Sequence, residues 1–238
     1  MTGTPDIIII GHGTGDALQI TAQAQQVLHR FGFAFAIGVA PLLSRLLTAS
    51  GVELDHLDET MLALPDPADA LLAAADIVFK QVEVEQPVVV LVPGNPLFLN
   101  SLSRFLIAEG GARGLAVQRL AGVSQLDVIV NELGIDVAGR GLQVFDAPSL
   151  VAGTSVLVPT VPVVVFRASE LTTGTGERYA ALLGQLGDAY PPDHAVTMFN
   201  IEPLDDRTSF ASVPLAKAAE LAEHLHIGSS LFIRPIAR

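Results

Sequence analysis

The sequence predicts an α/β protein of two lobes, with a parallel β-sheet in the N-terminal lobe and a mixed sheet in the C-terminal lobe. Hydrophobic residues make up 50% of the 238 residues and charged residues 16%, which indicates extensively buried strands and helices. The longest apolar runs, such as residues 7–10 and 88–92, are strand-sized and far shorter than the roughly 18 residues that span a bilayer. Strand patterns alternate with helical patterns, as in parallel sheets covered on both faces.

In the first half of the chain, a buried strand leads through a glycine turn to a helix that opens at an acidic residue, Asp16. Pro67 stands at a first-turn position of a later helix, and Gly110-Gly111 is expected to end another. We expect strands at residues 6–10, 33–39, 88–92 and 116–120, and helices at 16–31, 41–49, 66–82, 99–109 and 124–133.

The second half has similar elements joined by longer loops. Residues 135–141 are expected to form a crossover, and the pattern changes near Ser149. We expect strands at residues 163–166, 195–199 and 230–233, and helices at 177–186 and 215–225. The predicted lobes are residues 1–122, which carry the glycine loops, and residues 123–238.

Composition and charge exclude several classes of function. With 13 basic and 25 acidic residues the formal charge is −12, and the arginines are scattered, so nucleic acid is not an expected partner. The chain has no cysteine, which removes thiolate metal sites and disulfides and makes a cytoplasmic protein the default expectation. His224 and His226 do not share a helix face, so no metal site is expected. Neither a secretory signal nor a membrane segment is expected.

Glycines cluster between the first strand and the first helix, in the segment Gly11-His12-Gly13-Thr14-Gly15-Asp16. Such a loop admits positive φ and close approach of a ligand to the backbone, and the helix N-terminus offers free N–H groups. A dinucleotide site is not predicted, because the spacing is GxGxG and no acidic residue follows the second strand. A tight turn without a ligand is the structural alternative. His12 is either a proton acceptor or substrate contact, or a solvated loop side chain.

Two further loops follow the third and fourth predicted strands. Residues 93–98, Pro-Gly-Asn-Pro-Leu-Phe, stand at the carboxyl end of a buried strand, where open α/β sheets bind ligands; a simple turn is the alternative. Residues 121–125, Ala-Gly-Val-Ser-Gln, do not match the GxSxG pattern of a serine nucleophile, because Leu126 replaces the last glycine. Ser124 is expected to be a helix N-cap or a cofactor contact.

These three loops, in this order, resemble those of the tetrapyrrole (corrin/porphyrin) methylase superfamily. That family has a glycine loop followed by Leu-Thr, a Gly-Asp-Pro loop after the third strand and a Pro/Ala-Gly-x-Ser segment. The similar segments here are GHGTGDALQIT, Gly94-Asn95-Pro96 and AGVSQ, and the resemblance covers nearly the whole chain. Three later segments are most similar to borosin peptide backbone N-methyltransferases: GVSQLDVIVNELGIDVAGRGLQVFDAPSL, YPPDHAVTMFNIEP and IGSSLFIRP. Two departures are Asn95 in place of Asp, and the lack of a Tyr/Arg cluster in residues 58–82.

The resemblance implies an S-adenosylmethionine-dependent methyltransferase of two lobes, in which the C-terminal lobe completes the cofactor cleft. It implies cofactor contacts at Pro93, Gly94, Asn95, Pro96, Leu97, Phe98, Ser124, Gln125, Phe166, Arg167, Ala168, Met198, Ser229 and Ser230. It implies that the acceptor faces Gly11, His12, Gly13, Thr14, Gly15 and Asp16, with His12 as the candidate catalytic residue. Because methyl transfer from a sulfonium depends mainly on alignment, no conspicuous catalytic side chain is required.

The resemblance to borosin enzymes implies a peptide acceptor, a ribosomally made precursor. This peptide is expected to arrive in trans, because the sequence stops at Arg238 directly after the last family motif. The alternatives are a tetrapyrrole or small-metabolite acceptor, and a non-catalytic family member that binds the cofactor or a partner protein. Family members pair as homodimers, so a homodimer is expected here.

Overall fold

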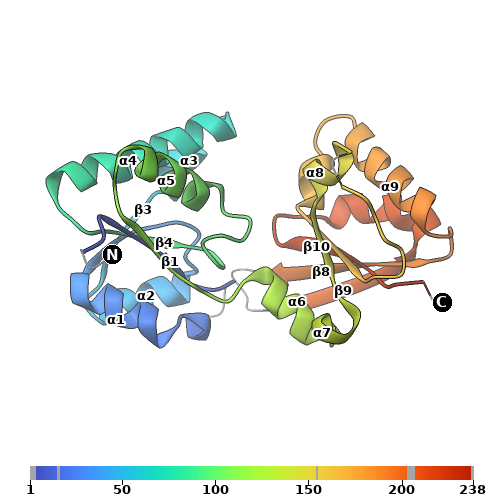
Figure 1. Cartoon of the computed structure of the whole chain (residues 1–238), viewed down its shortest axis with the longest axis horizontal. Coiled ribbons are helices and arrows are strands. Elements are labelled where there is room, and N and C mark those ends of the chain that lie inside the picture. The colour runs from blue at the N-terminus through green and yellow to red at the C-terminus, as the bar shows by residue number, and fades with distance from the viewer. Residues whose placement is uncertain (1–3, 15–16, 154, 203–206, 237–238) are drawn as a thin grey trace. The chain divides into compact units, whose positions relative to one another are not determined.

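The computed structural model describes residues 4–14, 17–153, 155–202 and 207–236 (Figure 1). The contacts divide these residues into two compact units, one reaching to Val128 and the other made of Ile129–Glu202 and residues 207–236. The division falls inside one helix, α6 Gln125–Leu133, whereas the sequence analysis set the lobe boundary after residue 122. Among the described residues, no helix is both long and apolar enough to cross a bilayer.

The first unit is built on a parallel sheet of five strands in the order β3-β2-β4-β1-β5. The strands are β1 Ile7–Gly11, β2 Phe33–Ala36, β3 Glu53–His56, β4 Val88–Val92 and β5 Val117–Leu120. Ile7 and Ile9 pack in one apolar cluster and Ile8 and Ile10 in another, so β1 is buried on both faces. The parallel sheet that the alternating pattern predicted is confirmed.

Helices cover both faces of this sheet (Figure 1). Side chains of α4 Pro67–Val84 and α5 Ser101–Ala112 pack with Ile7 and Ile9, and those of α1 Ala22–Phe31 and α2 Pro41–Ala49 pack with Ile8 and Ile10. A short helix, α3 Asp58–Leu62, precedes α4.

Two strands of the first unit differ from the prediction. β3 was not predicted, because it is an edge strand whose Glu53, Asp55 and His56 are exposed and so lack an apolar alternation. β2 ends at Ala36, three residues before the predicted strand end at Val39.

Two helices also differ. The helix expected from residue 16 starts as a 3-10 helix, η1 Ala17–Gln19, and α1 begins only at Ala22, because the Thr21 side chain accepts a hydrogen bond from the Ala24 amide at 3.1 Å. Asp16 lies outside the described residues. The glycine pair expected to end a helix at residue 110 lies inside α5, which continues to Ala112.

The second unit contains a mixed sheet of five strands in the order β6-β7-β10-β8-β9. The strands are β6 Gln143–Asp146, β7 Val163–Phe166, β8 Ala195–Glu202, β9 Arg207–Pro214 and β10 Ser229–Ile233. β6 and β7 are parallel and all other pairs are antiparallel, which confirms the predicted mixed sheet. β6 and β9 were not predicted, because their exposed edge positions leave them without a continuous apolar run.

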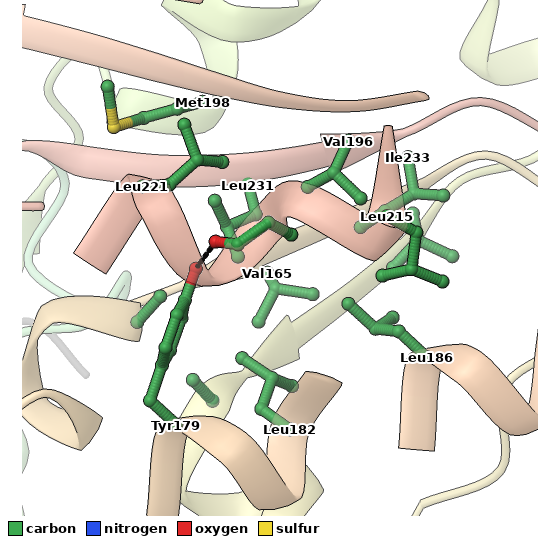
Figure 2. Close-up of a cluster of buried hydrophobic side chains, with 14 of the residues drawn as sticks. Val165, Tyr179, Leu182, Leu186, Val196, Met198, Leu215, Leu221, Leu231 and Ile233 are labelled. Atoms are coloured by element: carbon green, nitrogen blue, oxygen red, sulfur yellow. Dashed lines mark hydrogen bonds between the residues drawn. The ribbon is translucent and has the colours of Figure 1, made fainter. Parts of the chain in front are cut away.

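Four helices of the second unit pack in one apolar cluster against one face of its sheet: α8 Ala147–Val151, η2 Ala168–Leu171, α9 Glu177–Ala189 and η3 Leu215–His224. The end of α6 and α7 Val137–Arg140 lie near Phe232, whose side chain points to the other face. The predicted helix at 215–225 is therefore present as a 3-10 helix. Figure 2 shows Tyr179 in the core between α9 and η3, where its hydroxyl donates a hydrogen bond of 3.0 Å to the carbonyl oxygen of Ala218.

Candidate functional site

The glycine loop after β1 and the loop after β4 meet at one edge of the first sheet. The His12 amide donates to the Val92 carbonyl oxygen at 2.9 Å, and the Gly94 amide donates to the Gly13 carbonyl oxygen at 2.8 Å. Gly13 and Gly94 thereby form an isolated antiparallel bridge. Because β1 and β4 are parallel neighbours, the two loops that follow them share one rim of the sheet.

Close packing of backbone explains two of the glycines at this rim. A Cβ atom on Gly11 would collide with the Gly94 carbonyl oxygen and lie 2.8 Å from the Gly122 amide nitrogen. A Cβ atom on Gly122 would collide with the same oxygen and lie 2.6 Å from the Gly11 carbonyl carbon. For the loop at residues 11–16, the glycines were expected to let a ligand approach the backbone; at Gly11 the correction is that the approaching groups are the protein's own loops, and the same packing explains Gly122.

At the other described glycines of the rim, the backbone conformation explains why the residue is glycine. Gly13 has a φ of +92° and Gly94 a φ of +66°, which side chains with a Cβ rarely adopt. Gln19 holds the Thr14 end of the loop, because its Oε1 accepts hydrogen bonds from the Thr14 amide at 2.7 Å and from the Thr14 hydroxyl at 3.0 Å. Gly15 and Asp16, which were predicted to contact the acceptor, lie outside the described residues.

His12 is buried rather than solvated. Its side chain is 2% exposed, and its Nε2 lies 3.1 Å from the Ile37 carbonyl oxygen at the end of β2, so Nε2 carries the donated proton. Burial lowers the pKa of His12 below its ordinary value of 6.5, with opposing contributions from hydrogen bonding and from the Asp58 carboxylate. His12 is therefore a neutral link between the ends of β1 and β2. Its role in proton transfer stays a prediction.

The loop at residues 93–98 is held by Asn95. The Asn95 Oδ1 accepts from the Leu97 amide at 3.0 Å, and its carbonyl oxygen accepts from the Phe98 amide at 2.9 Å. Pro96 is buried, whereas Leu97 is 57% exposed. The asparagine that replaces the family's aspartate thus makes an Asx turn, which either side chain can make.

Ser124 is the N-cap of α6. Its hydroxyl donates to Asp127 Oδ2 at 2.6 Å, and the Asp127 amide donates back to the hydroxyl oxygen at 3.2 Å. The Ser124 amide also donates to Asp127 Oδ2, at 2.7 Å. This reciprocal capping box starts the helix at Gln125 and confirms the predicted N-cap. Gln125, the neighbouring candidate, is the first residue of α6.

In the second unit, the candidate residues Phe166, Ser229 and Ser230 come together at one end of the sheet, beside Phe199. Ser230 pairs with Phe166 on one side and Phe199 on the other, and all three are fully buried. The Ser230 Oγ has no hydrogen-bond partner among the described residues. Beside it, the Ser229 hydroxyl donates to Asn200 Oδ1 at 2.7 Å. Asn200 was not predicted to be a site residue, and it is identified only by its position opposite Ser229 on the neighbouring strand.

Arg167 is held by two carboxylates at the same end of the sheet. Its Nε and Nη2 each lie 2.6 Å from Asp146 Oδ1, and its Nη1 lies 3.1 Å from Glu170 Oε1. The residue has a φ of 57°, in the left-handed region that a non-glycine residue seldom occupies. These contacts hold the turn after β7, whose next residue, Ala168, is fully buried.

Met198 does not join this group through its side chain. It is paired with Leu231, and both side chains belong to the core that contains Tyr179 (Figure 2). Successive residues of a strand point to opposite faces, so Met198 faces away from the row of Phe166, Phe199 and Ser230. Any cofactor contact at Met198 therefore uses its backbone.

No group of three or more His, Asp or Glu side chains in the described ranges is arranged to hold a metal ion.

The sequence matches a family model and a known protein. The family model of the Tetrapyrrole (Corrin/Porphyrin) Methylases matches residues 6–200. A protein of Anomoporia bombycina, described as a methyltransferase/ribosomally synthesized type III borosin cyclic peptide precursor, is 22% identical over 210 residues. That match covers 85% of this chain and 24% of the relative, so the chain spans about a quarter of the relative's length.

Two solved structures share the fold. The uroporphyrin-III C-methyltransferase of Thermus thermophilus, complexed with S-adenosylhomocysteine, has a TM-score of 0.68 and 15% identity, with 98% of this chain and 97% of that chain covered. Cobalt precorrin-4 methyltransferase has a TM-score of 0.65 and 14% identity, with 96% and 94% covered. Since the family model spans most of the sequence, the chain belongs to the tetrapyrrole (corrin/porphyrin) methylase family.

Proposed function

We propose that this chain is an S-adenosylmethionine-dependent methyltransferase whose acceptor is a peptide, methylated on a backbone nitrogen. Membership of a methylase family supports methyl transfer, and the solved structure with S-adenosylhomocysteine supports the cofactor. The single observation that favours a peptide is the match to the borosin precursor protein, which covers 85% of this chain.

The residues of the chain fit the cofactor in one testable respect. The Ser230 Oγ is a fully buried hydroxyl without a partner in the described part of the chain, and a buried polar group left unpaired costs about 1–3 kcal/mol. A polar ligand that accepts its hydrogen bond removes that cost. We therefore assign a cofactor contact to Ser230, and further contacts to Phe166, Arg167 and Ser229 beside it.

At the rim of the first unit, we assign cofactor contacts to residues 93–98 with Ser124 and Gln125, and acceptor contacts to residues 11–16. The glycine packing, the Asx turn of Asn95 and the capping box of Ser124 support the described parts of these loops with the protein's own contacts. Preorganised loops lose little conformational freedom on binding, which favours affinity.

When bound, S-adenosylmethionine would supply a sulfonium methyl group that a nucleophile of the acceptor can take up, with S-adenosylhomocysteine as the leaving group and loss of the proton from the acceptor nitrogen. The chain has to align the acceptor with that methyl group and exclude water. Alignment of reactants contributes about 7–11 kcal/mol, whereas a general base contributes about 3–5 kcal/mol. A buried, neutral His12 is therefore compatible with catalysis, whether or not it accepts a proton.

A tetrapyrrole acceptor is the second candidate, favoured by the similarity of fold to uroporphyrin-III C-methyltransferase and cobalt precorrin-4 methyltransferase. The two candidates are separated by one competition assay. The chain is incubated with S-adenosylmethionine carrying a labelled methyl group, a set of synthetic apolar peptides and uroporphyrinogen III. Tandem mass spectrometry then shows which acceptor carries the label and on which atom.

We expect label on a peptide backbone nitrogen and none on the tetrapyrrole. Label on the tetrapyrrole alone contradicts the peptide proposal but leaves methyl transfer standing. Calorimetry with S-adenosylmethionine and S-adenosylhomocysteine tests the broader proposal, because an absence of binding to both removes it. Binding of both without transfer to any acceptor indicates a non-catalytic family member.

The cofactor contact of Ser230 is tested by Ser230→Ala. Loss of one neutral hydrogen bond, worth about 0.5–1.5 kcal/mol, is expected to weaken S-adenosylmethionine binding about two- to ten-fold. Ser44→Ala, in α2, removes the same group elsewhere and is the matched control. Equal affinity of Ser230→Ala and the wild-type chain contradicts the assignment.

A further inference from the structure

A cavity separate from the loops described above lies within the second unit. Its volume is about 510 Å³, within the range of about 300–1,000 Å³ that is typical of small-molecule sites. Leu133 and Ile135 line one part of it, and Pro162 and Phe232 line another. About half of the wall is apolar.

This cavity is at the opposite end of the sheet from the proposed cofactor contacts. Pro162 directly precedes β7 and Arg234 directly follows β10, whereas Phe166 ends β7 and Ser230 lies at the start of β10. Because β7 and β10 are antiparallel neighbours, Pro162 and Arg234 share one end and Phe166 and Ser230 share the other. The cavity residues Pro162 and Arg234 are thus distinct from the proposed cofactor contacts Phe166 and Ser230.

Two arginines line the same cavity, Arg140 from the end of α7 and Arg234 from the end of β10. Among the described residues, no carboxylate oxygen lies within 4.0 Å of either guanidinium group. The one acidic residue in the wall, Asp136, is used as the N-cap of α7, where its Oδ1 accepts from the Gly139 amide at 2.9 Å. In a chain with 25 acidic and 13 basic residues, two arginines without ion partners therefore share one cavity.

The backbone that carries both arginines is held in place. The Arg234 carbonyl oxygen accepts a hydrogen bond of 2.8 Å from His194 Nε2, and the Arg140 amide donates to the Asp136 carbonyl oxygen at 3.1 Å. Phe232, two residues before Arg234 and on the same side of the strand, is only 7% exposed. Charged groups on a fixed backbone beside an apolar wall favour a ligand with both an anionic and an apolar part.

We propose that this cavity binds a small organic carboxylate, with its apolar body against Phe232 and its carboxylate held by Arg140 and Arg234. Guanidinium groups bind carboxylates through paired N–H donors, and such charge-assisted hydrogen bonds are about twice as strong as neutral ones. This site is additional to methyl transfer and does not depend on the proposed function.

The test uses two probes of matched shape, 4-phenylbutyrate and its neutral counterpart 4-phenylbutanol. Each is titrated into the whole chain at low ionic strength, without S-adenosylmethionine, and binding is followed by two-dimensional NMR of the backbone amides. The variants are Arg140→Gln and Arg234→Gln. Arg104→Gln, on the exposed surface of α5 in the first unit, changes the net charge equally and is the control.

We expect 4-phenylbutyrate to bind at least about ten-fold more tightly than 4-phenylbutanol, which corresponds to about 1.4 kcal/mol. Each cavity variant is expected to weaken 4-phenylbutyrate about ten-fold and to leave 4-phenylbutanol unchanged, which also shows that the variant is folded. Arg104→Gln is expected to change neither affinity. Equal binding of the two probes overturns the proposal, as does unchanged binding of 4-phenylbutyrate to both cavity variants or no binding of it to the wild-type chain.

Discussion

Gly11→Ala tests whether the packing of three loops holds the rim of the first sheet. The added methyl group meets the Gly94 carbonyl oxygen and lies 2.8 Å from the Gly122 amide nitrogen. Both are backbone atoms, so no side-chain rotation relieves the collision, and overpacking of this kind costs about 1–3 kcal/mol. Replacing glycine also stiffens the unfolded chain, which returns about 0.4–1 kcal/mol. The expected net loss is about 1–2 kcal/mol of unfolding free energy.

Gly111→Ala is the matched control for this change. Gly111 lies inside α5, and a Cβ atom there meets no other atom within 4 Å. The same substitution is therefore expected to stabilise the chain, by about 0.5–1 kcal/mol, because alanine is the better helix former.

Equilibrium urea unfolding measures both variants, and calorimetry with S-adenosylmethionine measures what the displaced rim does to binding. We expect Gly11→Ala to weaken the cofactor and Gly111→Ala to leave its affinity unchanged. Unfolding curves of Gly11→Ala that match those of the wild-type chain would refute the packing argument. A destabilised Gly11→Ala variant with unchanged cofactor affinity would refute the link between the rim and the cofactor, and leave the packing argument intact.

Three further predictions concern buried polar groups. Burial raises the pKa of Tyr179 to about 12, so the folded chain keeps a proton that the unfolded chain releases near pH 10. The free energy of unfolding should therefore fall by about 3 kcal/mol between about pH 10 and about pH 12. In urea unfolding, Tyr179→Phe should lack this fall and should be about 1 kcal/mol less stable at pH 7, because it loses one hydrogen bond. Burial lowers the pKa of His12, so the free energy of unfolding should fall as the pH drops below 6.5. Thermal unfolding of His12→Gln should lack this fall, and the same fall in the variant would contradict the role of His12 in it. Ser124→Ala removes the cap of α6 and should cost about 1 kcal/mol in urea unfolding, whereas Ser44→Ala should cost much less; equal losses would mean that the cap contributes nothing.

The central strands and the type of sheet in each unit could be predicted from the amino-acid sequence. Strand-sized apolar runs such as residues 7–10 and 88–92, separated by helical patterns, predicted a parallel sheet buried on both faces, because only that arrangement buries strands without a polar face. The same alternation put the glycine loop and the Gly-Asn-Pro loop at the carboxyl ends of parallel strands. The edge strand β3 was not predicted, because its exposed, charged residues do not form an apolar run.

The contacts of the individual site residues depend on the three-dimensional fold. Gly11 and Gly122 pack against each other and against the Gly94 carbonyl oxygen, which leaves no room for a Cβ atom. Arg167 is held by Asp146. These partners are 21 to 111 residues apart in the chain. A local pattern reports which backbone conformation a segment prefers, but not which distant atoms will approach it. For that reason the sequence located the loops, whereas the packing of their backbones, the buried His12 and the unpaired hydroxyl of Ser230 were visible only in the folded chain.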